Sequence, residues 1–177
     1  MGSEMCIRDR LNTMPTTQLQ TLANTVAALL KKRSETISIA ESSTGGLLSA
    51  TLLAVPGASA YYGGGSVVYT STARELYLGI NFEDHPGMRS ASESYAALLA
   101  KTSRQLLNTT WGLSETGAAG PTGNAYGDEA GHTCVAVSNE NIELEATIET
   151  GDNDRGENMQ FFAITALKLL QKALQES

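Results

Sequence analysis

Residues 40–52 read AESSTGGLLSATL and join an apolar run to an amphipathic one. The run that ends here, 36–40, has the composition of a short buried strand, and the leucines after the glycines recur at helical spacing. A helix start needs only one Ser or Thr as its N-cap, whereas this turn carries Ser42, Ser43 and Thr44. The excess of hydroxyl groups indicates chemistry, and a capped helix with a glycine turn is the structural alternative.

The rest of the chain alternates further strands and helices. Turn residues and apolar spacing predict a helix after Thr17 and a short helix capped by Ser71 that ends at Gly79. The other expected elements are a strand at 66–69 after three glycines, a helix across 95–106, a strand at 111–115, a glycine-rich loop at 116–123, strands at 133–137 and 142–148, and a final amphipathic helix. We therefore expect an α/β fold, a single domain whose mixed β-sheet is covered by helices on both faces.

Composition narrows the class of protein. With 177 residues, 41% of them apolar, the chain fits one domain with a real core, and a net charge of −7 disfavours nucleic acid as a partner. Cys6 and Cys134 stand far apart, which argues against a disulfide framework, and no apolar run approaches a membrane span. We expect a cytoplasmic protein without membrane partners, with residues 1–13 as a non-native or disordered tail before a domain at 14–177.

Three loops leave predicted strand ends, at 42–46, 70–74 and 116–123. In open α/β sheets, ligands bind beyond the carboxyl ends of the strands, so these loops are the candidate site. The first two open helices whose free N–H groups favour an anion or a developing oxyanion. A surface loop is the structural alternative for the third.

The histidines indicate no metal site. His85 and His132 belong to no ligand spacing and have no cysteine partners, so we expect neither a metal nor a cofactor. His85, beside a proline, is interpreted as a surface loop residue, and His132 as a packing residue at a strand start. No G-x-S-x-G elbow supports a serine triad.

Four segments in order carry a family resemblance: AESSTGGLLSATL at 40–52, PGASAYYGGGSVVYTSTAR at 56–74, SETGAAGPTG at 114–123 and GDNDR at 151–155. They resemble the CinA C-terminal domain family of nicotinamide-nucleotide amidohydrolases, over roughly Leu19 to Leu174. The resemblance implies a three-layer α/β/α fold and a homo-oligomer. It also implies hydrolysis of the carboxamide of nicotinamide mononucleotide to nicotinate mononucleotide and ammonia, with a pyridine nucleotide as the small-molecule partner.

The resemblance also implies roles for individual residues. Ser42 matches the serine nucleophile, Tyr69 the family's tyrosine, and Arg74 stands at its lysine. The implied substrate-binding residues are Thr44, Gly45 and Gly46 as backbone donors, Thr116, Gly117 and Gly120 along the nucleotide, and Arg155 of the last motif.

Three departures leave alternatives open. Ser43 stands where the family usually has cysteine, and Met159 follows Arg155 where a second arginine is common. Arg74 cannot deprotonate a serine as a lysine can, because guanidinium stays protonated in proteins. A catalytically impaired nucleotide-binding or regulatory protein, or an amidohydrolase with another substrate, therefore remains an alternative.

Overall fold

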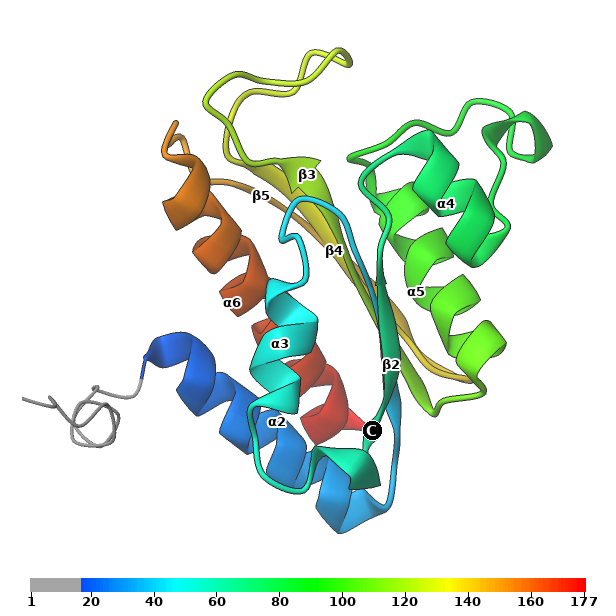
Figure 1. Ribbon diagram of the computed structural model, residues 1–177, viewed down its shortest axis with the longest axis vertical. Coiled ribbons are helices and arrows are strands. Elements are labelled where there is room, and N and C mark those ends of the chain that lie inside the picture. The colour runs from blue at the N-terminus through cyan, green and yellow to red at the C-terminus, as the bar shows by residue number, and fades with distance from the viewer. Residues whose placement is uncertain (1–16) are drawn as a thin grey trace, which may run out of the picture.

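The computed structural model describes residues 17–177 and shows a five-stranded mixed sheet between two layers of helices (Figure 1). The strand order is β2-β1-β3-β4-β5, with these bounds: β1 Ile37–Glu41, β2 Tyr62–Val67, β3 Trp111–Ala118, β4 His132–Ser138 and β5 Glu143–Glu149. β2, β1 and β3 run parallel, and β4 and β5 pair antiparallel. The predicted α/β fold with a mixed sheet is confirmed; the expected tail, 1–13, lies outside the described residues.

Helices cover both faces of the sheet, as predicted. Figure 1 shows α2, α3 and α6 on one face and α4 and α5 on the other. Their bounds are α2 Gln18–Arg33, α3 Leu47–Leu53, α4 Ser71–Leu78, α5 Glu93–Leu107 and α6 Arg155–Glu176, with short 3₁₀ turns at Ala58–Ala60 and Phe82–Asp84. Within residues 17–177 no helix has both the length and the apolar character needed to cross a membrane.

The core is divided between the two faces. The larger cluster lies under α2, α3 and α6 and includes Ile37, Ile39 and Trp111, all fully buried. A smaller cluster around Tyr95 and Leu99 lies under α4 and α5. Every residue of β1 is buried, because this strand is central and covered on both sides. The carboxyl end of β1 is therefore a rigid support for the turn that follows it.

Glycine explains two of the predicted boundaries that are wrong. The glycines at 63–65 lie inside β2 rather than before it, because a Cβ at Gly65 would come within 2.5 Å of both Ser49 Oγ and Tyr62 Oη. β3 extends through 116–118, where a Cβ at Gly117 would overlap the backbone of β4. Glycine here permits close packing between elements, whereas the sequence pattern placed these glycines outside the strands.

The helix starts follow ordinary capping chemistry. The hydroxyl of Thr17 accepts the N–H of Gln20 at the start of α2, as predicted. The N-cap of α4 is Thr70, one residue before the predicted Ser71, because its hydroxyl accepts the N–H of Ala73 at 3.1 Å. The segment after β2 therefore enters α4 in a fixed direction.

Gly112 sets how closely α5 packs on the sheet. A Cβ at this position would overlap the carbonyl oxygen of Ala100 in α5. Gly112→Ala should lower the free energy of unfolding by about 2 kcal/mol, because helix and strand must separate. Gly156→Ala is the control, since its Cβ meets nothing closer than 3.5 Å in the first turn of α6, and it should be neutral or stabilising by about 0.5 kcal/mol. Chemical denaturation measures the free energy of unfolding of both variants, and equal values would contradict the prediction.

Candidate active site

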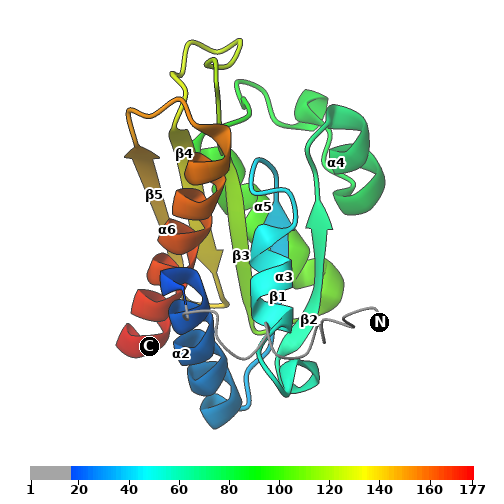
Figure 2. The same cartoon turned by 60° about the vertical axis from the view of Figure 1, so that its left-hand side comes forward.

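The three loops singled out from the sequence meet at one end of the sheet, beyond the carboxyl ends of the parallel strands (Figure 2). A cavity of about 200 Å³ is lined by side chains of all three, among them Ser42, Tyr69, Arg74 and Thr116. An adjoining cavity of about 270 Å³ is lined by Ser43, Tyr69, Gly117, Gly120 and Arg155, together with other residues of the third loop. Tyr69, Gly117 and Asn124 line both cavities. We call these two hollows the Ser42 cavity and the Arg155 cavity.

Ser42 presents a free hydroxyl to the Ser42 cavity. The residue is half-buried, and its backbone N–H donates to the carbonyl oxygen and to Oε2 of Glu115, at 3.1 and 3.2 Å. Across residues 17–177 its hydroxyl has no hydrogen-bond partner. The backbone at Ser42 is thus held firmly while its oxygen is left for a ligand.

Glu115 is a site residue that the sequence interpretation missed. It is fully buried, and its carboxyl group faces the N–H of Thr44 at 2.9 Å as well as the hydroxyls of Ser43 and Thr133. Burial raises the pKa of this carboxyl group, against the opposing effect of these hydrogen bonds. Its place at the end of the strand predicted at 111–115 was the available signal, but its contacts with Ser43 and Thr44 join residues more than 70 positions apart.

Glu41 supports the same turn from the neighbouring strand. It lies opposite Glu115 in the β1–β3 register and is also fully buried. It accepts the N–H groups of Leu48 and Ser49 at 3.1 and 3.0 Å and the Ser49 hydroxyl at 2.7 Å. Because these N–H groups at the start of α3 already donate to Glu41, they are not available to a ligand anion, contrary to the sequence-based expectation.

Thr44 connects the two carboxyl groups. Its hydroxyl oxygen lies 2.7 Å from Glu41 Oε2 and 3.0 Å from Glu115 Oε2, yet one hydroxyl can donate its proton only once. A proton on one carboxyl group accounts for both contacts, and we assign it to Glu115, because burial raises the pKa of this carboxyl group.

The expected backbone donors of this turn are largely engaged. The N–H of Thr44 goes to Glu115, and the N–H of Gly45 donates to the carbonyl of Ser42 at 3.1 Å. Thr44, Gly45 and Gly46 line neither cavity. Their glycine conformations, with φ of 64° and 102° at Gly45 and Gly46, instead allow the tight turn that aims Ser42.

Arg155 links the third loop to Tyr69. Its guanidinium donates to the carbonyl of Gly120 at 2.6 Å and to the hydroxyl of Tyr69 at 3.2 Å. Asn158, one turn further along α6, donates to the carbonyl of Ala119 at 2.8 Å. The start of α6 therefore fixes the backbone of this loop and places a cation at the cavity wall.

Arg74 lines the Ser42 cavity but is also part of its frame. It is 7% exposed, its Nε donates to the carbonyl of Ile80 at 3.0 Å, and its guanidinium carbon lies 3.7 Å from the centroid of the Phe82 ring. Beside it, burial raises the pKa of Tyr95 to about 12. Tyr95 is therefore a neutral phenol at neutral pH and not a base.

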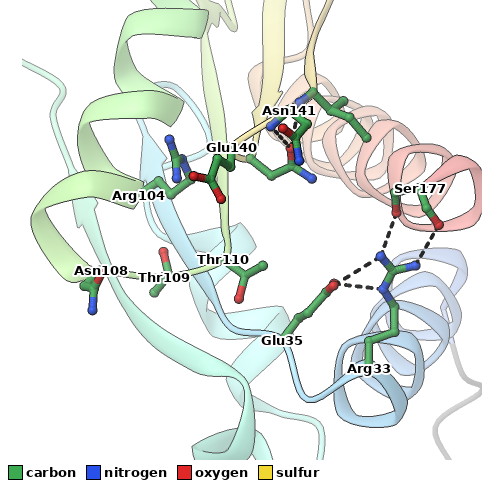
Figure 3. Close-up of a pocket in the computed structure, with 11 residues that line it drawn as sticks. Arg33, Glu35, Arg104, Asn108, Thr109, Thr110, Glu140, Asn141 and Ser177 are labelled. Atoms are coloured by element: carbon green, nitrogen blue, oxygen red, sulfur yellow. Dashed lines mark hydrogen bonds and ion pairs between the residues drawn. The ribbon is translucent and has the colours of Figure 1, made fainter.

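A larger cavity, of about 710 Å³, lies at the opposite end of the sheet (Figure 3). Its Arg33 is paired with Glu35 at 2.8 Å and donates to Ser177 Oγ at 2.8 Å, so it joins the ends of α2 and α6. None of the predicted site residues lines it. Among residues 17–177 no grouping of His, Cys, Asp and Glu is suited to a metal ion.

Fold and site together define an α/β domain with a hydroxyl-bearing turn and two adjoining cavities at the carboxyl edge of its parallel strands. The CinA C-terminal domain family matches residues 19–174. CinA-like proteins of Desulforapulum autotrophicum and Parasynechococcus marenigrum are 34% identical over 154 residues and 38% identical over 155 residues, covering 87% and 86% of this chain. The chain belongs to the CinA C-terminal domain family.

Solved structures agree with this assignment. The competence/damage inducible protein CihA of Agrobacterium tumefaciens is similar with a TM-score of 0.83 and 27% identity, over 92% of this chain and 99% of that one. A CinA superfamily protein of Klebsiella pneumoniae shares the fold, with a TM-score of 0.84 at 24% identity over 90% and 99% of the two chains. This chain spans only 36% and 37% of the two curated relatives.

The proton on Glu115 predicts how stability depends on pH. A carboxyl group whose pKa is raised by folding contributes its full stability below the unfolded pKa, about 4.3, and loses it as pH rises toward the folded pKa. Glu115→Gln cannot ionise, so relative to the native protein the variant should gain stability between pH 4 and 7.

Chemical denaturation over this pH series measures the difference between Glu115→Gln and the native protein. Glu143→Gln, on the exposed side of β5, removes a carboxylate outside the turn and serves as the control. A constant difference across the series for Glu115→Gln would contradict the assigned proton.

Proposed function

We propose that this domain hydrolyses the carboxamide of nicotinamide mononucleotide, giving nicotinate mononucleotide and ammonia. The observation that carries the proposal is the free Ser42 hydroxyl in a cavity shared with Tyr69, Arg74 and Thr116. Membership in the CinA C-terminal domain family supports it, because the four motifs that resemble the family's amidohydrolases supply most of the residues that line the two cavities.

The chemistry follows from amide hydrolysis by a serine. Ser42 Oγ bonds to the carbonyl carbon, the carbon–nitrogen bond breaks, and the hydroxyl proton leaves with the nitrogen as ammonia. Water then cleaves the ester, which yields the carboxylate and restores the Ser42 hydroxyl. Glu115 holds the backbone of Ser42 during both steps, so the attacking oxygen keeps its direction.

The adjoining cavity suits the phosphate end of the nucleotide. Arg155 brings a guanidinium beside Tyr69 and Gly120, and phosphate is a ligand that arginine binds through paired hydrogen bonds. Tyr69 and Gly117 line both cavities, so a single ligand fits across them. The reacting carboxamide would lie at Ser42 and the charged end at Arg155.

A second candidate function is nucleotide binding without turnover. The contacts of Arg74 with Ile80 and Phe82 favour it, since they use this residue to support the cavity wall. Met159 favours it as well, because its methyl group packs against the Gly45 turn and supplies no charge. On this reading the purified protein binds nicotinamide mononucleotide and releases no ammonia.

Replacing Ser42 tests the nucleophile. Ser42→Ala should abolish ammonia release from nicotinamide mononucleotide and leave its Kd within about threefold, because the hydroxyl acts in the reaction rather than in binding. Nicotinamide riboside and glutamine are the substrate controls. Ser43→Ala is the matched variant: it loses one hydrogen bond to Glu115, should cost about 1 kcal/mol in stability and should keep turnover. Turnover lost in Ser43→Ala and kept in Ser42→Ala would assign the nucleophile to Ser43.

Replacing Arg74 tests whether a proton acceptor is the missing element. If the native protein is slow because guanidinium cannot accept the serine proton, Arg74→Lys should raise kcat by about 10²-fold, with a rise at alkaline pH as the amine becomes neutral. Arg74→Gln removes the cation without adding a base and is the control. A robustly active native protein that Arg74→Lys fails to improve would show that the proton has another acceptor.

A further inference from the structure

His132 lies between two hydrogen-bond acceptors at the start of β4. The residue is 5% exposed, on the face of the sheet covered by α5. Its Nδ1 contacts Glu149 Oε1, and its Nε2 lies 2.9 Å from the carbonyl oxygen of Ala91. A neutral imidazole has one N–H, so both contacts together require the imidazolium form, which donates from both nitrogens.

The groups around the ring favour this charge. Glu149 comes from β5, and Asp128 Oδ2, from the loop before β4, lies 3.8 Å from Nε2. Arg89 forms an ion pair with Asp128 at 2.6 Å, and its positive charge partly offsets the negative charge of Asp128. Burial opposes the charge, but the bonds to Glu149 and Ala91 and the attraction of Asp128 outweigh it and raise the pKa of His132.

Two further polar groups complete these surroundings. The thiol of Cys134 lies 3.6 Å from Nε2, and burial raises its pKa, so it is neutral at neutral pH. Glu93 of α5 accepts a hydrogen bond from Thr147 at 2.7 Å on the same face of the sheet. The ring is therefore surrounded by more negative than positive charge.

Ala91 links this ring to the candidate site. Its φ of 53° is unusual for a residue with a side chain, so its conformation is maintained by its surroundings. Its carbonyl faces His132, and its N–H donates to Thr116 Oγ1 at 3.2 Å. Ser90, Ala91 and Thr116 all line the Ser42 cavity.

We propose that His132 is a positioning residue whose imidazolium holds the 90–91 segment against Thr116, so that the wall of the Ser42 cavity loosens when the ring loses its proton. In one neutral tautomer a lone pair would face the Ala91 carbonyl. In the other, the bond to Ala91 survives but loses its charge, and charge-assisted hydrogen bonds are about twice as strong as neutral ones. Either neutral tautomer therefore weakens the hydrogen bond between His132 and the carbonyl of Ala91.

Ring-nitrogen NMR tests the protonation directly, without reference to any enzymatic activity. The chain has only two histidines, so His85→Gln assigns the signals of His132. We expect both ring nitrogens of His132 to be protonated at pH 7, with a transition above the ordinary value of about 6.5. The amide signals of Ala91 and Thr116 should follow the same transition. A ring that carries a single proton at pH 7, or amide signals that ignore its titration, would overturn the proposal.

Two variants separate positioning from packing. Glu149→Gln keeps an acceptor at Nδ1 but removes its charge, so the His132 transition should move to lower pH; an unmoved transition counts against the proposal. His132→Gln retains a donor that does not titrate. The Kd of the native protein for nicotinamide mononucleotide should rise about fivefold as pH passes through the His132 transition, and His132→Gln should abolish this rise while His85→Gln keeps it. A rise of equal size in His132→Gln would assign it to another group.

Discussion

The candidate site depends on two fully buried carboxyl groups, those of Glu41 and Glu115, which share the hydroxyl of Thr44 as a neighbour. Glu41, the last residue of β1, lies opposite Glu115 of the adjacent parallel strand β3, and both are fully buried. Two buried carboxylates in contact would repel each other and lose their hydration, so such a pair persists only when protons and donors compensate it. Here the donors are the backbone and hydroxyl groups of the Ser42 turn and the first N–H groups of α3. The turn therefore cannot rearrange without leaving a buried carboxyl group unsatisfied.

This arrangement explains why a turn rich in hydroxyl groups follows β1. Ser43 and Thr44 direct their hydroxyls inward to the carboxyl pair, and Ser42 alone among the three leaves its hydroxyl in a cavity. The hydroxyl excess visible in the sequence thus has two origins. The hydroxyls of Ser43 and Thr44 form hydrogen bonds with the buried carboxyl groups, and the hydroxyl of Ser42 is available for a ligand. The structural and functional interpretations of the motif are both needed to account for it.

Sequence patterns predicted the elements of the fold well and their boundaries less well. Alternation in β5 and helical spacing in α2 depend on local periodicity, which the sequence displays directly. The glycines of β2 were expected to precede the strand, because the close approach of Ser49 and Thr109 that requires them comes from other parts of the chain. Leu106 ends the helix predicted across 95–106 but is 59% exposed, because apolar spacing cannot show which part of a helix lies against the sheet.

The candidate site, too, could be predicted from the sequence only in part. The convergence of three loops followed from the rule that parallel strands end at one edge, and it required no knowledge of side chains. The partnership of Glu41 with Glu115 could not be predicted, because a glutamate at a strand end ordinarily indicates solvent. The role of His132 was missed for a similar reason. Its partners, Ala91 and Glu149, lie 41 and 17 positions away, and the two-sided contact that requires its charge exists only after folding.

The cations of the site have unequal freedom, and this limits what it can recognise. Arg74 is buried, with Nε bound to a carbonyl and its guanidinium against the Phe82 ring, so its side chain has little freedom to move toward a ligand. Arg155 is exposed, and its bond to the Tyr69 hydroxyl is one that a ligand phosphate can replace with a stronger, charged partner. With Met159 uncharged beside the turn, attraction for an anion in these cavities rests mainly on Arg155. The pyridine nucleotide that we propose as the substrate would therefore be oriented by one guanidinium at its phosphate and by the rigid Ser42 turn at its ring.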